Sequence, residues 1–213
     1  MVYKGKKDSN FIFNGLTYNI YPYGHILVEK VFEEKVANDI LNWLENNELW
    51  KYNDASNHKS SGFFINKDNL PDNLLSVFSG ESLENLLDTF EEIFKTSFFE
   101  KFSVAAVKHE VGHGTTIHTD YIENNKADFT HRFIVYLNRD WKEDDGGLFG
   151  VFKGRNMDSL VSTIPPLNNS GVGLYISQTS YHAVSVVKNS RRFSLVFSLL
   201  SRDGHDNGSG ISY

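Results

Sequence analysis

Residues 116–120 contain the first side chains whose types and spacing could do chemistry. His118 and Asp120 stand two residues apart in a stretch, Thr-Ile-His-Thr-Asp, that is typical of extended backbone. Alternate residues of a strand project from the same face, so this imidazole and this carboxylate could bind one metal ion together. The alternative is a solvated strand end without a ligand. The motif therefore needs support from other parts of the chain.

A second histidine on a predicted strand is one source of support. Residues 181–187 favour a strand, and alternation places His182 on the same side as Val184 and Val186, where it could face a barrel interior. A single histidine can equally be a hydrogen-bonded structural group in a core. His182 is therefore a candidate ligand only in combination with His118 and Asp120.

An arginine begins the last predicted strand, residues 192–199. One face of this strand is apolar and suits packing against helices, and the opposite face carries Arg192, Ser194, Val196 and Ser198. An inward-facing guanidinium is costly to bury unless it meets an anion. Arg192 therefore needs a carboxylate, which could belong to a ligand or to an internal acidic residue. Alternation selects Arg192 over Arg191 and places the Ser194 hydroxyl beside it.

The composition limits the possible functions. The 213 residues are 40% hydrophobic with only 4 proline residues, which indicates a globular chain rather than a disordered one. The net charge of -6 comes without a basic cluster, which argues against nucleic acid or an anionic membrane as the main partner and favours a small-molecule or peptide substrate. Since the chain has no cysteine, a metal would have to be bound by histidine, aspartate or glutamate.

No segment has the composition of a signal peptide or a membrane span. The first eight residues are basic but no apolar run follows them, and no later segment approaches 18 uncharged apolar residues. We therefore expect a cytoplasmic protein without a membrane anchor. The sequence gives no indication of its oligomeric state.

The first half of the chain favours a hairpin and two helices. Residues 11–28 are rich in aromatic and β-branched residues around Asn14-Gly15, a pattern typical of a β-hairpin. Residues 33–46 and 81–94 have apolar side chains at helical spacing, which predicts two amphipathic helices. Residues 51–73 lack sustained periodicity and predict a loop with one short strand at most.

The second half of the chain favours short strands. No secondary structure is predicted for residues 153–170, which lie between two of these strands. Many short strands without intervening helices predict a sandwich or jelly roll behind two helices. The predicted strands cover residues 102–108, 115–120, 132–138, 148–152, 172–176, 181–187 and 192–199.

Taken together, these candidates resemble the Fe(II)- and 2-oxoglutarate-dependent oxygenases, most closely their prolyl-hydroxylase-like branch. The resemblance covers about residues 100–200: His118-x-Asp120 is followed by His182 and Arg192 at the spacings of that family. The segment Tyr136-Leu-Asn-Arg-Asp-Trp141 and the following Asp145-Gly-Gly-Leu148 are similar to segments of that branch, and Gly112 stands six residues before His118.

The resemblance implies a fold, a cofactor and a reaction. The expected fold is a double-stranded β-helix (jelly roll, cupin-like) core of residues 101–200, packed against a hairpin and helices in residues 1–100 and followed by a tail, 201–213, in one domain. The implied iron ligands are His118, Asp120 and His182. Arg192 would bind the distal carboxylate of 2-oxoglutarate, helped by Ser194 and Tyr136. Hydroxylation of an unactivated C–H bond, with succinate and CO2 as coproducts and ascorbate as a supporting reductant, is the implied activity.

One position departs from the family pattern, and two other functions stay open. The family often has a tyrosine nine residues before the first ligand, where this chain has His109; we expect His109 and His113 to lie in an exposed turn, in solvated or substrate-facing roles. Desaturation or demethylation could use the same site. A cupin-like binding or sensing module without turnover is the alternative from another class, but such a module has no need for the inward Arg192.

Overall fold

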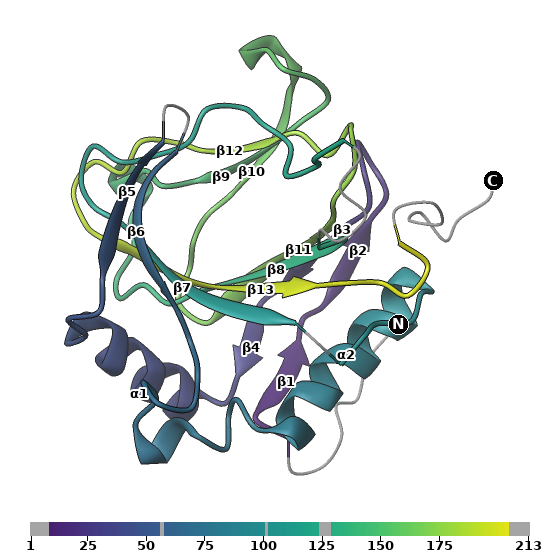
Figure 1. Ribbon diagram of the computed structural model, residues 1–213. Coiled ribbons are helices and arrows are strands. Elements are labelled where there is room, and N and C mark those ends of the chain that lie inside the picture. Colours follow the sequence, from purple (N-terminus) through teal and green to yellow (C-terminus); the bar gives the residue numbers. More distant parts are fainter. Residues whose placement is uncertain (1–8, 56–57, 101, 124–128, 205–213) are drawn as a thin grey trace.

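The computed structural model describes residues 9–55, 58–100, 102–123 and 129–204. These residues form three antiparallel sheets and two α-helices (Figure 1). The helices are α1 (Glu34–Glu45) and α2 (Gly80–Phe94). The strands are β1 (Phe11–Asn14), β2 (Thr17–Asn19), β3 (His25–Val28), β4 (Lys30–Phe32), β5 (Lys51–Ala55), β6 (His58–Phe64), β7 (Ser103–His109), β8 (His131–Tyr136), β9 (Phe149–Phe152), β10 (Leu160–Ile164), β11 (Ser170–Tyr175), β12 (His182–Val184) and β13 (Arg192–Leu199).

Two of these sheets face each other. The large sheet has eight strands in the order β2-β3-β11-β8-β13-β7-β6-β5, and the small sheet has three in the order β10-β9-β12. Figure 1 shows the small sheet above the large one, with α1 and α2 on the far side of the large sheet. This arrangement confirms the predicted jelly-roll core with helices against it.

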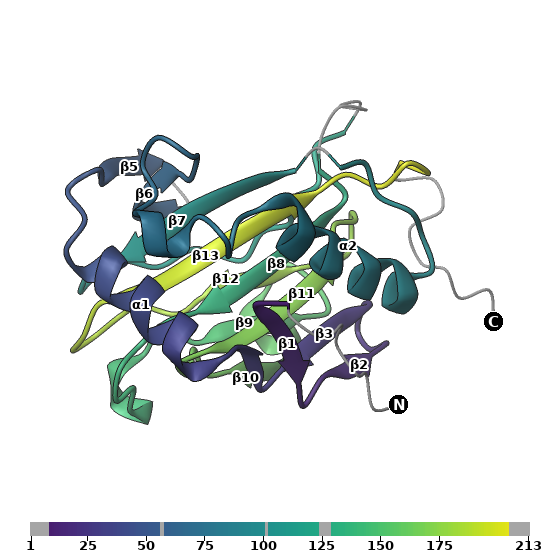
Figure 2. The same cartoon turned by 90° about the horizontal axis from the view of Figure 1, so that it is seen from below.

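The main hydrophobic core lies between the large sheet and the helices. Alternation along β13 places Phe193, Leu195 and Phe197 on this outer face, where they are buried. The apolar sides of α1 and α2 cover them (Figure 2). The inner face of the same strands is thereby left free for polar side chains such as Ser194 and Ser198.

Both helices form where their apolar periodicity predicts them. Helix α1 buries Ala37, Ile40, Leu41 and Leu44, which are spaced three or four residues apart. Helix α2 buries Leu86, Phe90 and Phe94 in the same way, and it ends at Lys95, which has a left-handed backbone with φ of 55°. The range predicted for α1, 33–46, extends one residue too far at each end, and the range predicted for α2, 81–94, begins one residue late.

The predicted N-terminal hairpin is wrong in its pairing. Strand β1 pairs with β4, and β2 pairs with β3, so Asn14-Gly15 does not join two adjacent partners. The side chain of Asn169 makes this arrangement possible, because its amide binds both the N–H and the C=O of Phe32 like a strand neighbour. A residue 137 positions away, which local patterns do not reveal, therefore fixes β4.

Three further segments differ from their predicted structure. Residues 51–55 and 58–64 form the antiparallel strand pair β5–β6 at the edge of the large sheet, where we predicted at most one strand. Residues 115–120 are extended but make only isolated bridges, so they are not a strand. The segment 153–170 contains β10, whose exposed residues give no alternation to detect.

No helix in the described ranges is long and apolar enough to span a membrane. The predicted tail lies largely outside the described residues, since the structure describes it only to residue 204.

Candidate active site

The structure brings His118, Asp120 and His182 together. One ligand-type atom from each side chain lies within 4.8 Å of the others. Reciprocal backbone hydrogen bonds of 3.0 and 2.9 Å join His118 and His182, so the extended segment is clamped opposite β12 even though it is not a strand. Both imidazoles project from the same side of this pair, with ring centroids 4.5 Å apart.

Hydrogen bonds fix the tautomer of each histidine. Nδ1 of His118 lies 2.7 Å from the carbonyl oxygen of Thr116, and Nδ1 of His182 lies 3.0 Å from that of Ser180. A carbonyl only accepts, so each Nδ1 carries the proton and each Nε2 keeps a free lone pair. These Nε2 atoms lie 3.6 and 3.9 Å from Oδ1 of Asp120. The three atoms thus form a donor set that suits a divalent metal.

Arg132 holds the other oxygen of Asp120. Its Nε donates to Oδ2 at 3.0 Å, and its Nη1 donates to the hydroxyl of Ser198, the residue directly opposite on β13. Burial favours a higher pKa for Asp120, but His182, Arg132 and His118 outweigh it and lower the pKa to about 2. Asp120 is therefore an anion with one oxygen free for a metal.

Arg192 is buried on the inner face of β13, and it is only 3% exposed. No described carboxylate pairs with it, so the structural salt bridge considered as an alternative is absent from the described ranges. Its guanidinium lies 4.8 Å from the ring centre of Tyr136, and its Nη1 donates to Nδ1 of His109 at 3.3 Å. By contrast, the neighbouring Arg191 is exposed and pairs with Glu110 at 3.2 Å.

Unsatisfied polar atoms gather around Arg192. Within the described residues, three buried side-chain nitrogen or oxygen atoms lack a hydrogen-bond partner: Nε of Arg192, the hydroxyl of Tyr136 and Nε2 of His109. Burial raises the pKa of Tyr136 to about 12 against the opposing charge of Arg192, so its hydroxyl keeps its proton. Buried polar groups are normally satisfied, so this cluster indicates a place for an anionic ligand.

The expected exposed turn at His109 is wrong. His109 is the last residue of β7, is 2% exposed and lies directly opposite Arg192 in the strand register. Burial and the charge of Arg192 lower the pKa of His109 to about 2, so the ring is neutral. Since Nδ1 accepts from Arg192, Nε2 carries the proton and is a donor. His113, whose Nδ1 accepts from the backbone N–H of Glu110, lies in the following turn.

The motifs around residues 136–148 build the surroundings of Arg192. The side chain of Asn138 accepts from the N–H of Phe193 at 2.7 Å, which fixes the start of β13. The indole of Trp141 donates to the carbonyl of Gly146 at 2.9 Å. The next residue, Gly147, has φ of 68°, and a Cβ there would lie 2.8 Å from Cδ of Arg192.

A cavity of about 1100 Å³ connects these groups. Its lining includes the candidate metal-binding triad, Arg132 and Arg192, together with the inner-face residues Ser194, Val196 and Ser198. Small side chains on the floor, such as Ala105 of β7, leave this space open. The triad therefore faces a space that could hold both a cosubstrate and a substrate.

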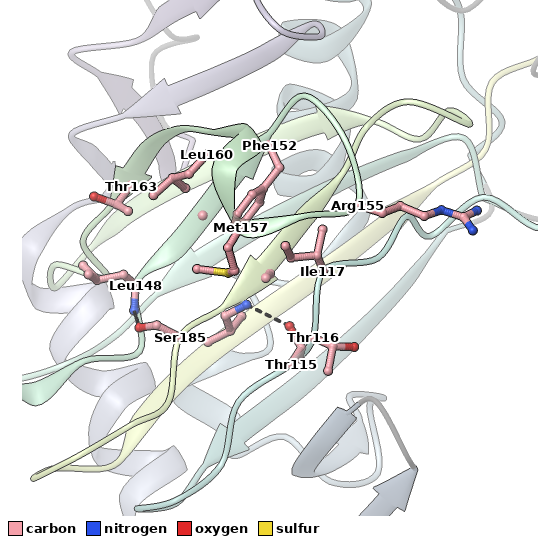
Figure 3. Close-up of a pocket in the computed structure, with 13 residues that line it drawn as sticks. Thr115, Thr116, Ile117, Leu148, Phe152, Arg155, Met157, Leu160, Thr163 and Ser185 are labelled. Atoms are coloured by element: carbon pink, nitrogen blue, oxygen red, sulfur yellow. Dashed lines mark hydrogen bonds between the residues drawn. The ribbon is translucent and has the colours of Figure 1, made fainter.

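A second hollow of about 470 Å³ lies beside the small sheet (Figure 3). Its lining is mainly apolar, with Phe152, Met157 and Leu160 near one another and Arg155 directed away from them. It contains neither a member of the triad nor a carboxylate. The candidate metal ligands and Arg192 line the larger cavity instead.

Sequence reasoning missed Arg132. The residue shares strand parity with Tyr136 on β8, so the argument that singled out Arg192, a cation on an inward face, applies to it equally. The role of His109 in binding Arg192 was also missed. It could have been found only from the register between β7 and β13, which the sequence alone does not fix.

Comparison with known proteins gives a family and a fold. Residues 102–199 match the model of the 2OG-Fe(II) oxygenase superfamily. No curated protein sequence matches the chain significantly.

Solved structures share the fold at low sequence identity. A prolyl-4-hydroxylase from Pseudomonas putida has a TM-score of 0.64 and 13% identity, over 82% of this chain and 91% of that one. A prolyl hydroxylase from Trichoplax adhaerens, in complex with a hypoxia-inducible-factor peptide fragment, has a TM-score of 0.67 and 12% identity, over 85% of each chain. An oxidoreductase of the 2OG-Fe(II) oxygenase family from Burkholderia pseudomallei has a TM-score of 0.60 and 17% identity, over 87% of each chain.

The family model spans the triad and the buried arginine, and the family uses Fe(II), 2-oxoglutarate and O2. Residues 102–199 are therefore a 2OG-Fe(II) oxygenase domain, the catalytic core of a dioxygenase.

Proposed function

We propose that this protein hydroxylates an unactivated C–H bond of an amino acid, a peptide or another small molecule, with 2-oxoglutarate converted to succinate and CO2. The observation that carries the proposal is the pairing of two features in one cavity: a two-histidine, one-carboxylate set and a buried guanidinium that pairs with no carboxylate of the described residues. Two histidines and one carboxylate leave coordination positions free for other ligands.

The residues present fit the cofactor. His118 and His182 would bind Fe(II) through Nε2, since their Nδ1 protons are already engaged by carbonyl groups. Asp120 would bind through Oδ1 alone, because Arg132 occupies Oδ2. Together with 2-oxoglutarate and O2, bound Fe(II) supplies the oxidising power of this family.

The cosubstrate would be fixed at the other end of the cavity. Arg192 would receive its distal carboxylate in the fork geometry of a guanidinium, with the hydroxyls of Tyr136 and Ser194 as further donors. Such an anion would satisfy the Tyr136 hydroxyl and the Arg192 Nε, which have no hydrogen-bond partner among the residues that the structure describes. It would also offset the charge of Arg192, whose pKa is lowered by burial.

We also infer that the chain works as one domain. Strands from both sides of residue 100 share the large sheet, and β6 pairs directly with β7. The N-terminal strands therefore complete the sheet that carries the site.

Succinate formation tests the proposed function. The purified protein, given Fe(II), ascorbate and 2-oxoglutarate in air, should release succinate slowly without an added substrate, and anaerobic titration should show one 2-oxoglutarate bound per Fe(II). A cupin-like module without turnover would bind metal but form no succinate. Absence of both binding and succinate would refute the proposal.

A further inference from the structure

The cavity that holds the triad is electropositive, although the chain as a whole is acidic. In the described ranges, the cavity is lined by three cationic residues, Lys51, Arg132 and Arg192, and by one acidic residue, Asp120. The chain carries a net charge of -6. Positive charge is therefore concentrated where the ligands would bind.

The cofactor and the cosubstrate do not remove this excess. On the proposed function, on which this inference rests, one Fe(II) and one 2-oxoglutarate dianion add no net charge. The distal carboxylate is paired with Arg192, and the metal takes up the charge of Asp120. Arg132 is then left as a cation whose carboxylate partner is shared with the metal, and Lys51 stands exposed at the β5–β6 hairpin.

Arg132 is built to receive a further anion. Its Nε and Nη1 are engaged by Asp120 and Ser198, which hold the guanidinium in place, while Nη2 makes no hydrogen bond with any described residue. The guanidinium lies 5.7 Å from the ring centre of Phe129, and the Arg132 side chain is 27% exposed and lines the cavity. A fixed and accessible donor of this kind suits one oxygen of a carboxylate.

We propose that the substrate of this oxygenase carries a carboxylate group and that Arg132 binds it. Because Arg132 and the candidate metal share the carboxylate of Asp120, the bound anion lies next to the metal. The oxidised carbon is consequently only a few bonds from the carboxylate, as in a free or N-acylated amino acid. The alternative is that Arg132 only positions Asp120, in which case the substrate has no charge preference.

Matched pairs of probes separate these two cases. The protein, loaded anaerobically with Mn(II) and 2-oxoglutarate, is titrated with a set of N-acetyl amino acids and the corresponding N-acetyl carboxamides, and binding is measured by calorimetry. At least one carboxylate should bind at millimolar concentration or better, and about tenfold or more tighter than its carboxamide. Carboxamides that bind as tightly, or a set in which no carboxylate binds, would overturn the proposal.

Variants of Ser198 test the charge without removing the partner of Asp120. Ser198→Asp places a carboxylate against Arg132 and should abolish the preference for carboxylates, whereas Ser198→Asn, the uncharged control of equal size that still accepts from Arg132, should keep it. Both variants should still bind Mn(II) and 2-oxoglutarate. An unchanged preference in Ser198→Asp would overturn the role of Arg132. If the wild-type protein binds neither Mn(II) nor 2-oxoglutarate, the proposed function itself fails, and this inference fails with it.

Discussion

Replacing Arg192 with methionine should have opposite effects on ligand binding and on stability. The side chain is 3% exposed, and only a tyrosine ring and a histidine nitrogen offset its charge. Loss of a hydrogen-bonded charge partner at such a desolvated site costs about 2–5 kcal/mol, which corresponds to a 2-oxoglutarate affinity that is weaker by roughly 30-fold to several thousandfold. Without ligand, however, the same change removes a buried and unpaired cation, so the apo protein should unfold at the same temperature or a higher one.

Thermal unfolding with and without ligand measures both effects. A ligand at 100 times its dissociation constant stabilises the folded state by about 2.7 kcal/mol. Adding 2-oxoglutarate to the Mn(II)-loaded protein should therefore raise the melting temperature of the wild-type protein further, and that of Arg192→Met much less. Arg191→Met is the matched control, because Arg191 is exposed and pairs with Glu110. If Arg191→Met loses the ligand response while Arg192→Met retains it, the reasoning from the inner face of β13 is refuted.

Three further outcomes are expected. His182→Ala should abolish stoichiometric Fe(II) binding, measured by equilibrium dialysis, while the control His113→Ala should leave it intact; iron retained in His182→Ala would remove that residue from the ligand set. Asp120→Gly should stop succinate formation. The change removes the carboxylate partner of Arg132 and opens a coordination position on Fe(II) beside this cation, so added chloride should partly restore the weakened Fe(II) affinity. Succinate formation at the wild-type rate would contradict this. His109 is buried and neutral with a pKa of about 2, against about 6.5 when unfolded. The stabilisation that results from keeping this ring neutral is fully present above pH 6.5, and the free energy of unfolding falls by up to about 1.4 kcal/mol per pH unit below that value. Urea unfolding at a series of pH values should therefore show a shallower decline on acidification in His109→Phe, and identical slopes would contradict the neutral assignment.

The sequence predicts those parts of this molecule in which local periodicity and burial agree. Helix α2 has an apolar face at helical spacing, and β13 alternates so regularly that the inward placement of Arg192 follows from parity alone. The same parity would have revealed Arg132 on β8. The wider fold class follows from the succession of short strands in the second half of the chain.

The remainder depends on contacts between distant residues. The pairing of β1 with β4 rests on Asn169, and the contact between His109 and Arg192 rests on the register of β7 with β13. The hairpin β5–β6 is an edge with polar residues on both faces, so it has no alternation to detect. In the first two cases the deciding contact joins residues 137 and 83 positions apart, which a local pattern does not report.

The contact between Gly147 and the stem of Arg192 affects how natural sequence variation in this family should be interpreted. A methyl group at position 147 would press on Cδ of Arg192 from 2.8 Å, and the left-handed backbone there is strained for any other residue. Gly147 does not line the cavity, yet its replacement would displace Arg192, the cation that we propose binds the cosubstrate. A natural substitution of Gly147 would therefore weaken ligand binding without touching the ligand. A comparison of sequences restricted to ligand-contacting positions would overlook it.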